Sequence, residues 1–181
     1  MYQEKLKYWN VKKGETIASI GAQSGILEVS LSLFVDSINW TLEDIDSACL
    51  NAAEFKRVYN HFNNISQRKI NSNFNLVVGT VSNTNLKSNF YDRVVLINVY
   101  HELATKNEIL LQIQNALKAN GSLIIMEKLA KKRNKKRRDC KHIMPFEPDF
   151  LLQLKNANFT LISKQESGKE TFFEFRKINL Q

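Results

Sequence analysis

Cysteine and histidine are scarce in this sequence, and they do not cluster along the chain. Of its 181 residues, two are cysteines, Cys49 and Cys140, and three are histidines. The cysteines lie far apart and form neither a Cys-x-x-Cys pair nor a zinc-type cluster with the histidines. The spacing therefore predicts no disulfide framework and no metal site, and both cysteines are interpreted as incidental thiols.

Long hydrophobic runs are also absent. No apolar segment approaches the roughly 20 residues that a membrane-spanning helix needs, and the opening segment Met1–Lys7 lacks the apolar core of a signal peptide. These absences favour a cytoplasmic protein without a membrane partner. A chain of this length, 43% hydrophobic and 10% aromatic, is long enough to bury a full core, and we predict one domain spanning residues 1–181.

Acidic residues are outnumbered, 18 against 26 Lys and Arg, which gives a net charge of +8. Nearly all of this excess lies between residues 131 and 142, where eight basic residues stand against one aspartate. Such a run is typical of a solvated, mobile segment, and we place a basic loop at residues 130–142. An alternative stays open, in which Lys131–Lys141 bind nucleic acid, an anionic substrate or another anionic partner. Because no aromatic residues are interleaved with the charges, base stacking lends nucleic acid no support.

Glycine is sparse as well, with six residues, yet two of them fall in one short turn. The segment Thr16–Ile20 is an apolar strand that runs into Gly21-Ala22-Gln23-Ser24-Gly25, followed by the amphipathic run 26–34. A strand, a glycine turn and a helix in that order form a nucleotide-sized binding corner. Gln23 and Ile26 stand where a dinucleotide site needs glycine, and the Gly-Lys-Ser/Thr of a P-loop is missing, so neither NAD nor ATP is favoured.

Strand and helix patterns alternate along the rest of the chain. Apolar spacing predicts further helices at 47–64, 105–118 and 145–156, with Gly121 near a helix C-terminal cap and Asp46 as a helix N-cap. The predicted strands are 16–20, 37–43, 74–78, 92–99, 122–127, 159–164 and 171–177, the last two joined by a turn at Ser167-Gly168. This order predicts an α/β fold, a three-layer Rossmann-like sandwich with a mostly parallel seven-stranded sheet and a C-terminal antiparallel hairpin.

Several short motifs occur in the order of a known family. They are Lys13-Gly14-Glu15 before the first strand, Ile20-Gly21-Ala22-Gln23-Ser24-Gly25 after it, Leu76–Thr80 ending in Gly79-Thr80, Val94–Leu103 ending in Asn98-Val99-Tyr100-His101-Glu102-Leu103, and Leu117–Ile125 containing Asn120-Gly121. With acidic residues after the second strand, this order resembles the class I S-adenosylmethionine-dependent methyltransferases. The resemblance covers about Val11 to Ile178.

The resemblance implies a cofactor site for S-adenosylmethionine. Its first motif places the glycine turn against the amino-acid part of the cofactor, and an acid after the second strand would accept hydrogen bonds from the ribose hydroxyls. Spacing does not separate two candidates for that acid. The implied cofactor-binding residues are Gly21, Ala22, Gln23, Gly25, Glu43, Asp44, Gly79, Thr80 and Asn98.

The resemblance also implies methyl transfer by in-line displacement to an unidentified acceptor, most simply a small molecule. Asn98 would face the methyl group and the substrate, and His101 is the candidate general base for a hydroxyl or amine acceptor. Packing or helix capping is the other interpretation of His101. Tyr100 and His142 are candidate substrate-side residues, and His61 is expected on a helix surface.

Two positions depart from the family pattern. Ser19 stands where a carboxylate usually orients the turn and helps hold the ammonium group of the cofactor, and Gln23 stands where a glycine lets the cofactor approach the backbone. These departures keep a second hypothesis open, a non-catalytic methyltransferase-like binding domain. A nucleic-acid-associated module that uses the basic loop is a third.

Overall fold

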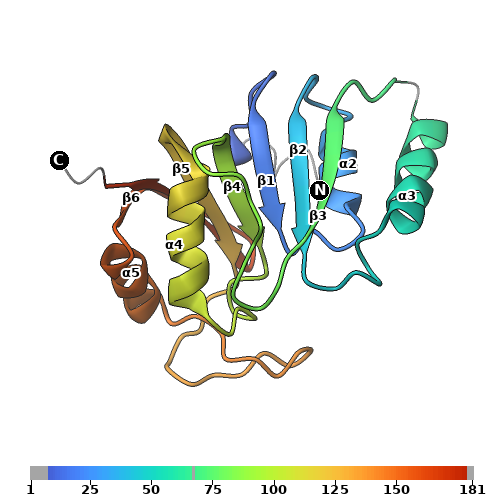
Figure 1. Ribbon diagram of the computed structural model, residues 1–181. Coiled ribbons are helices and arrows are strands. Elements are labelled where there is room, and N and C mark those ends of the chain that lie inside the picture. Colours follow the sequence, from blue (N-terminus) through green and yellow to red (C-terminus); the bar gives the residue numbers. More distant parts are fainter. Residues whose placement is uncertain (1–7, 67, 179–181) are drawn as a thin grey trace.

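The computed structural model describes residues 8–66 and 68–178, which build one continuous sheet with helices on both sides (Figure 1). Along the sheet the strands follow the order β3-β2-β1-β4-β5-β7-β6. The first five pair in parallel, and β7 runs antiparallel between β5 and β6. The strands are β1 (Thr16–Ile20), β2 (Asn39–Asp44), β3 (Asn73–Val78), β4 (Tyr91–Ile97), β5 (Leu117–Glu127), β6 (Phe159–Ser167) and β7 (Glu170–Lys177). The predicted mostly parallel sheet with its closing hairpin is confirmed.

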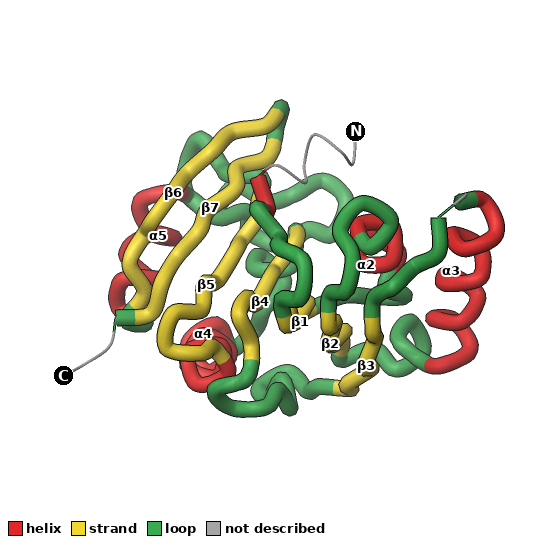
Figure 2. Tube along the Cα trace, turned by 90° about the horizontal axis from the view of Figure 1, so that it is seen from above, coloured by secondary structure: helices red, strands yellow, loops and turns green. Residues whose placement is uncertain are grey.

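Helices cover both faces of the sheet, which gives three layers (Figures 1 and 2). Helices α4 (Lys106–Ala116) and α5 (Glu147–Asn156) pack on one face, where their apolar side chains share a buried cluster with residues of β1, β4 and β5. On the other face lie α2 (Ile26–Leu31) and α3 (Ala52–Ile65), beside Trp9 and the opposite side chains of the same strands. Strands buried on both sides explain the continuous apolar run at 94–97.

The register of the central strands brings their carboxyl ends to one edge. Ile20, the last residue of β1, pairs with Glu43 of β2 on one side and with Leu96 of β4 on the other. The loops that follow these three strands therefore begin side by side. In an open α/β sheet this edge is where ligands collect, because the strand order reverses at β1.

Two local predictions were wrong. Helix α3 begins at residue 52, and its N-cap is Asn51, whose side-chain oxygen accepts hydrogen bonds from the backbone N–H groups of residues 53 and 54. Asp46 closes a separate turn by accepting from the N–H of Ala48. Helix α4 ends at Ala116, and Gly121 lies inside β5 without a left-handed φ. Glycine suits this position because a Cβ would approach the carbonyl oxygen of Tyr91 to 2.9 Å.

Disulfide bonds and membrane-spanning helices are both absent from the described ranges. Both cysteines are free thiols. None of the described helices has the length and apolar character needed to cross a membrane.

Candidate active site

A cavity of about 710 Å³ opens at the carboxyl edge of the sheet. Its wall is formed by the turn after β1, the end of β2, the loop after β3 and the segment after β4. This volume is within the range of small-molecule sites. Of the residues predicted to bind a cofactor, the cavity is lined by Gly21, Ala22, Gln23, Glu43, Asp44, Thr80 and Asn98.

The glycine turn is fixed by the end of β2. The backbone N–H of Ala22 donates to the carbonyl oxygen of Glu43 (3.0 Å), and that of Gln23 donates to the Asp44 carboxylate (2.8 Å). Gly21 has a φ of +70°, and a Cβ there would lie 2.5 Å from the Val99 side chain. Gln23 also adopts a positive φ of 50°. The turn is thus a strained backbone corner that the neighbouring strand holds in shape.

Gly25 and Gly79 serve packing in this structure. A Cβ on Gly25 would meet Leu42 at 2.6 Å, and one on Gly79 would lie 1.8 Å from the carboxyl group of Glu43. Neither glycine is among the residues that line the cavity. The structure therefore does not place these two glycines on the cavity wall, where direct contact with a cofactor was predicted.

A buried carboxylate that the sequence reasoning missed lies beside Ser19. The Ser19 hydroxyl donates to Glu28 Oε1 at 2.5 Å, and both residues are 2% exposed and line the cavity. Glu28 Oε2 is buried and has no hydrogen-bond partner among the described residues. Burial raises the pKa of Glu28 to about 7, although the hydrogen bond from Ser19 acts in the opposite direction and lowers it. An unpaired buried carboxylate oxygen is costly, so it marks a place where a polar partner fits.

The two acidic residues at the end of β2 have different environments. Glu43 is 2% exposed, and burial, reinforced by the nearby charge of Asp44, raises its pKa to about 8. Its carboxyl group packs against Gly79. Asp44 accepts hydrogen bonds from the backbone N–H groups of Gln23 (2.8 Å) and Asp46 (2.9 Å), which suit an ionised carboxylate.

Asn98 marks the point where β4 leaves the sheet. It has a left-handed φ of 57°, its amide nitrogen donates to Glu170 (3.1 Å), and its amide oxygen accepts from Arg137 at 3.3 Å. The side chain is thus held between the hairpin and the basic loop, and it lines the cavity. The predicted position at the strand end is confirmed.

His101 and Glu127 form a buried pair behind this edge. Their side chains are each 1% exposed, and His101 Nδ1 lies 2.9 Å from Glu127 Oε1 and 3.1 Å from Oε2. The backbone N–H of His101 also donates to Oε1. Because Nδ1 faces only carboxylate oxygens, we assign the proton to Nδ1, which leaves a lone pair on Nε2. Sequence reasoning did not connect Glu127 with His101.

Two other predicted substrate-side residues lie in a neighbouring cavity of about 630 Å³, which shares Glu102, Leu103 and Ala104 with the first. Tyr100 is 2% exposed, and its hydroxyl donates to Gln153 at 2.5 Å. Burial raises its pKa above the ordinary range. His142 lines the same cavity, with its ring centroid 6.2 Å from that of His101. His61 is exposed on α3, as expected.

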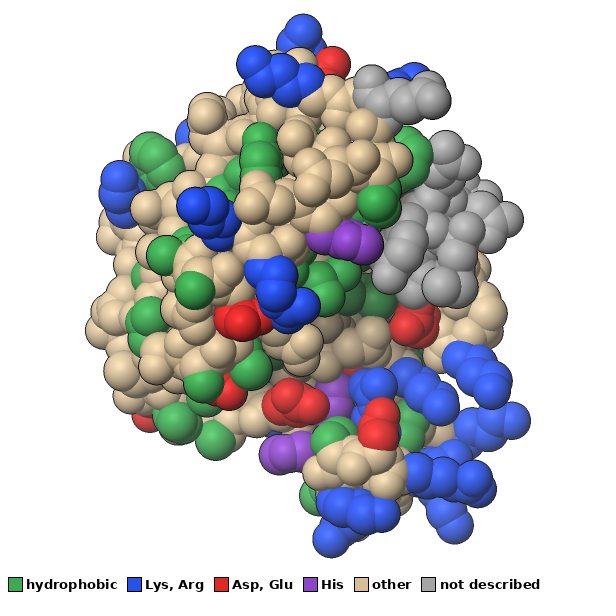
Figure 3. Space-filling model, turned by 90° about the vertical axis from the view of Figure 1, so that its right-hand side faces the viewer, with side chains coloured by type: hydrophobic (Ala, Val, Ile, Leu, Met, Phe, Trp, Pro, Cys, Tyr) green, Lys and Arg blue, Asp and Glu red, His purple; other side chains and the backbone are tan. Residues whose placement is uncertain are grey.

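The basic loop is folded against the site, and its charge is not only solvated surface. The N–H of Arg137 donates to the carbonyl of His142, and Met144 pairs in the same way with Lys135. The Arg137 side chain is 23% exposed and lines the first cavity, whereas its neighbour Arg138 is exposed. Figure 3 shows Lys and Arg side chains gathered at the end of the molecule that this loop occupies.

Comparison with known proteins shows the family to which the chain belongs. A family model described as a methyltransferase domain matches residues 24–125, which is more than half of the chain. No curated protein matches the sequence.

Several solved structures share the fold. A SAM-dependent methyltransferase from Aquifex aeolicus has a TM-score of 0.73 and 19% identity, with 96% of this chain and 87% of that chain covered. One from Methanosarcina mazei has a TM-score of 0.72 and 14% identity, with 98% of each chain covered. A TehB-like SAM-dependent methyltransferase from Corynebacterium glutamicum has a TM-score of 0.68 and 17% identity, with 98% and 88% covered. At these identities the likeness establishes the Rossmann-like fold.

Proposed function

The chain belongs to the methyltransferase domain family, of the class I S-adenosylmethionine-dependent type, and from this premise we propose that it methylates a small anionic molecule on a hydroxyl or amine. The cofactor is S-adenosylmethionine, which supplies a methyl group on a positively charged sulfur. The observation that carries the proposal is the cavity where β1, β2 and β4 end, walled by the carboxylates of Glu28 and Asp44.

The donor set of the cavity fits this cofactor. A sulfonium and an ammonium group need nearby negative charge, and Glu28, when ionised, would offer it through the unpaired Oε2. The position that carries a carboxylate elsewhere in the family is Ser19 here, and the Ser19 hydroxyl binds Glu28. We therefore assign to Glu28 the role of holding the ammonium group.

Asp44 is the better candidate for the ribose hydroxyls. A ribose ligand of this kind must accept hydrogen bonds, which favours a carboxylate that is ionised at neutral pH. Glu43, with its pKa raised to about 8, carries a proton at pH 7. Its side chain instead fills the space above Gly79. The roles of Gly21, Ala22 and Gln23 are to present backbone to the cofactor, with Thr80 on the opposite wall.

His101 is proposed as the general base. Its Nε2 would take the proton of the acceptor hydroxyl or amine, and S-adenosylmethionine, when bound, would supply the methyl group. The buried Glu127 carboxylate at Nδ1 then stabilises the imidazolium. Asn98, fixed from both sides, helps orient the reactants.

Positive charge around the second cavity supports an anionic acceptor, whereas the first is lined by one arginine and six acidic residues. Arg137 reaches the first cavity, and the second is lined by Lys106, Arg133, Lys136 and Lys141 against the acidic residues Glu102 and Asp149. Cationic walls raise the local concentration of anions and position them. This supports a small anionic substrate. The nucleic-acid alternative is supported only by the exposed part of the basic loop.

Calorimetry with the demethylated product S-adenosylhomocysteine tests the cofactor site. The full chain is expected to bind it with 1:1 stoichiometry, and Asp44→Ala should weaken binding about tenfold or more, since charge-assisted hydrogen bonds contribute roughly 1.5–3 kcal/mol. Glu43→Gln is the matched control and should bind like the wild type. Absence of binding at millimolar ligand would contradict the cofactor assignment.

The acceptor class needs a separate screen. Hydroxyl and amine compounds that carry a carboxylate or phosphate are compared with their neutral esters, with S-adenosylhomocysteine release as the readout. Anionic compounds should be preferred, and Arg137→Gln should reduce that preference while the exposed neighbour variant Arg138→Gln should not. Cofactor binding without turnover of any acceptor would favour the non-catalytic domain.

A further inference from the structure

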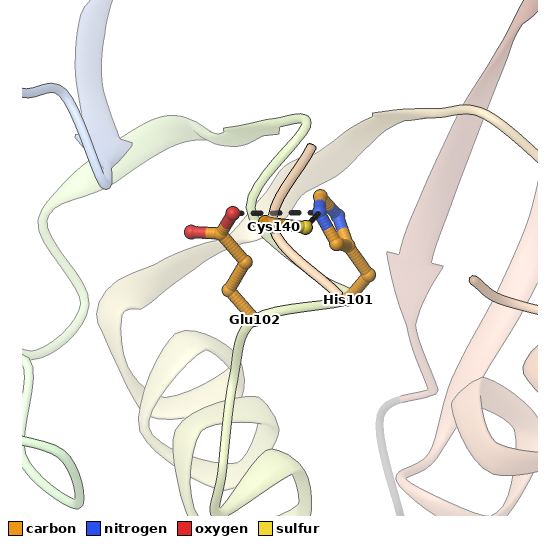
Figure 4. A group of neighbouring side chains, drawn as sticks. All are labelled: His101, Glu102 and Cys140. Atoms are coloured by element: carbon orange, nitrogen blue, oxygen red, sulfur yellow. Dashed lines mark hydrogen bonds and ion pairs between the residues drawn. The ribbon is translucent and has the colours of Figure 1, made fainter. Parts of the chain in front are cut away.

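Three potential metal ligands converge on one edge of the His101 ring (Figure 4). Cys140 Sγ and Glu102 Oε1 each lie 3.4 Å from His101 Nε2, and the three ligand atoms are all within 4.8 Å of one another. His101 and Glu102 follow β4, whereas Cys140 comes from the basic loop, 39 positions away from the histidine. Folding thus creates a cluster that the sequence spacing did not predict.

The imidazole of this cluster is oriented as in metal sites. Glu127 holds Nδ1 at 2.9 Å, which turns the lone pair of Nε2 toward the thiol and the second carboxylate. A carboxylate behind a histidine is the usual outer partner of a metal-binding imidazole, because it fixes the tautomer and raises the basicity of the ligand. The Glu127 side chain is 1% exposed, so this orientation is built into the core.

Two of the three separations between ligand atoms match those of a small tetrahedral site. Bonds of about 2.0 Å from zinc to nitrogen and about 2.3 Å to sulfur place neighbouring ligand atoms roughly 3.3–3.6 Å apart at the tetrahedral angle. The two separations of 3.4 Å fall in this interval. Nitrogen, sulfur and oxygen together suit Zn²⁺, whereas Mg²⁺ and Ca²⁺ prefer oxygen alone.

We propose that His101, Glu102 and Cys140 form a Zn²⁺ site with three protein ligands and one open position. This inference goes beyond the proposed methyl transfer and does not depend on it. Zinc binding requires loss of the Cys140 thiol proton and uses the Nε2 lone pair. If His101 is the general base, zinc and the acceptor proton compete for that one nitrogen.

The positive charge of a neighbouring arginine opposes Zn²⁺ binding. Arg137 Nη1 lies 3.4 Å from His101 Nε2 and must move when Zn²⁺ binds. Its guanidinium already pairs with Asp139 through Nε at 3.0 Å, so a negative partner is in reach after that movement. Removal of the arginine charge should therefore tighten zinc binding.

The test uses the full chain, reduced and freed of metal by a chelator, and titrated with zinc chloride against a chromophoric competitor. Binding of one Zn²⁺ per chain is expected. Cys140→Ser and Glu102→Gln should each weaken it by about tenfold or more, because loss of even an outer partner costs about 10–100-fold. Cys49→Ser, which removes the other thiol, should bind like the wild type, and Arg137→Gln should bind more tightly.

Cobalt supplies a readout independent of affinity. Co²⁺ in place of Zn²⁺ should give a thiolate-to-metal absorption band in the wild type and in Cys49→Ser, and none in Cys140→Ser. Absence of stoichiometric binding, or equal binding by the Cys140 variant with native circular dichroism, would overturn the proposal. Titration of the same samples with S-adenosylhomocysteine measures cofactor binding separately, so the zinc proposal and the proposed function can fail independently.

Discussion

At the scale of single residues, Ser19 and Glu28 show how a missing charge is replaced in space. The serine itself carries no negative charge, yet its hydroxyl binds Glu28, whose second oxygen is left without a partner among the described residues. The two residues are nine positions apart and reach each other because α2 packs on the face of β1 that Ser19 occupies. The departure from the family pattern thus does not by itself remove negative charge from the site.

Glu28 should make cofactor binding depend on pH. Its pKa is raised to about 7 in the free protein, and an ammonium group beside it favours the ionised form, so binding releases a proton at low pH. Affinity for S-adenosylhomocysteine should rise about five- to tenfold from pH 6 to 7.5. Glu28→Gln should bind more weakly, with a flat profile. Calorimetry at both pH values tests this prediction. Equal affinity of the wild type at the two pH values would refute the role of Glu28.

Glu43 should limit stability at high pH. An acid whose pKa is higher in the folded than in the unfolded state holds its proton more tightly when folded, so the free energy of unfolding falls as pH rises from about 4.5 toward 8. Relative to Glu43→Gln, the wild type should lose about 2–4 kcal/mol across this interval. Urea unfolding at pH 5 and pH 8.5 measures the difference, and Glu54→Gln on the exposed surface of α3 serves as the control.

At the scale of elements, Arg93 of β4 connects three parts of the fold at the edge opposite the cavity. Its side chain is 8% exposed and lies 3.0 Å from Glu15, which precedes β1, and 3.4 Å from Glu174 of β7. It also donates to the Ser122 hydroxyl of β5 at 3.3 Å. The glutamate of the Lys-Gly-Glu motif is therefore explained by an ion pair with the central strand.

Removal of this arginine should destabilise the fold strongly. Arg93→Leu leaves two partly buried carboxylates without their partner, which typically costs about 3–5 kcal/mol. Arg57→Leu is the matched control, because Arg57 pairs with Glu54 on an exposed helix surface and such pairs contribute about 0–1 kcal/mol. Urea unfolding of both variants provides the comparison. Equal losses in the two variants would show that the Arg93 contacts are not stabilising.

At the scale of the whole molecule, the two edges of the sheet have different roles. The Arg93 contacts lie at the amino ends of the parallel strands, and the cavities lie at their carboxyl ends. The basic loop adds its positive charge at the second edge (Figures 1 and 3). The Arg93 contacts and the residues that line the cavities thus lie at opposite ends of the parallel strands.

Ligand binding should therefore slow local amide exchange at only one edge of the sheet. At about 100 times its dissociation constant, S-adenosylhomocysteine should stabilise the protein by roughly 2.7 kcal/mol, which corresponds to an increase of about 5–10 °C in Tm. Amide hydrogen exchange should slow in the turn at 21–25 and around Asn98, while the β6–β7 turn at Gly168 remains unchanged. Core amides that exchange through global unfolding should slow as well, so the contradicting result is equal protection of the Gly168 turn and the turn at 21–25.

Element boundaries show where sequence patterns stop being informative. Apolar patterns predicted a strand at each described position of the sheet, and continuous apolar runs marked the central strands such as β1 and β4, which are buried on both faces. Helix ends were predicted less well, since a cap depends on which side chain reaches the free N–H groups. Asn51 does so, and Asp46 does not. Gly121 serves close packing against Tyr91 and not a helix end.

The sequence by itself determined the order of elements, the corner at Gly21 and the position of Asn98 after β4, because these depend on residues that are neighbours along the chain. The tertiary structure alone decided which charges meet. Glu28 reaches Ser19, Glu127 reaches His101, and Cys140 reaches the same ring only after strand pairing and loop packing join distant segments. Burial then sets the proton affinity of Glu28 and Glu43, and no pattern of neighbours encodes burial.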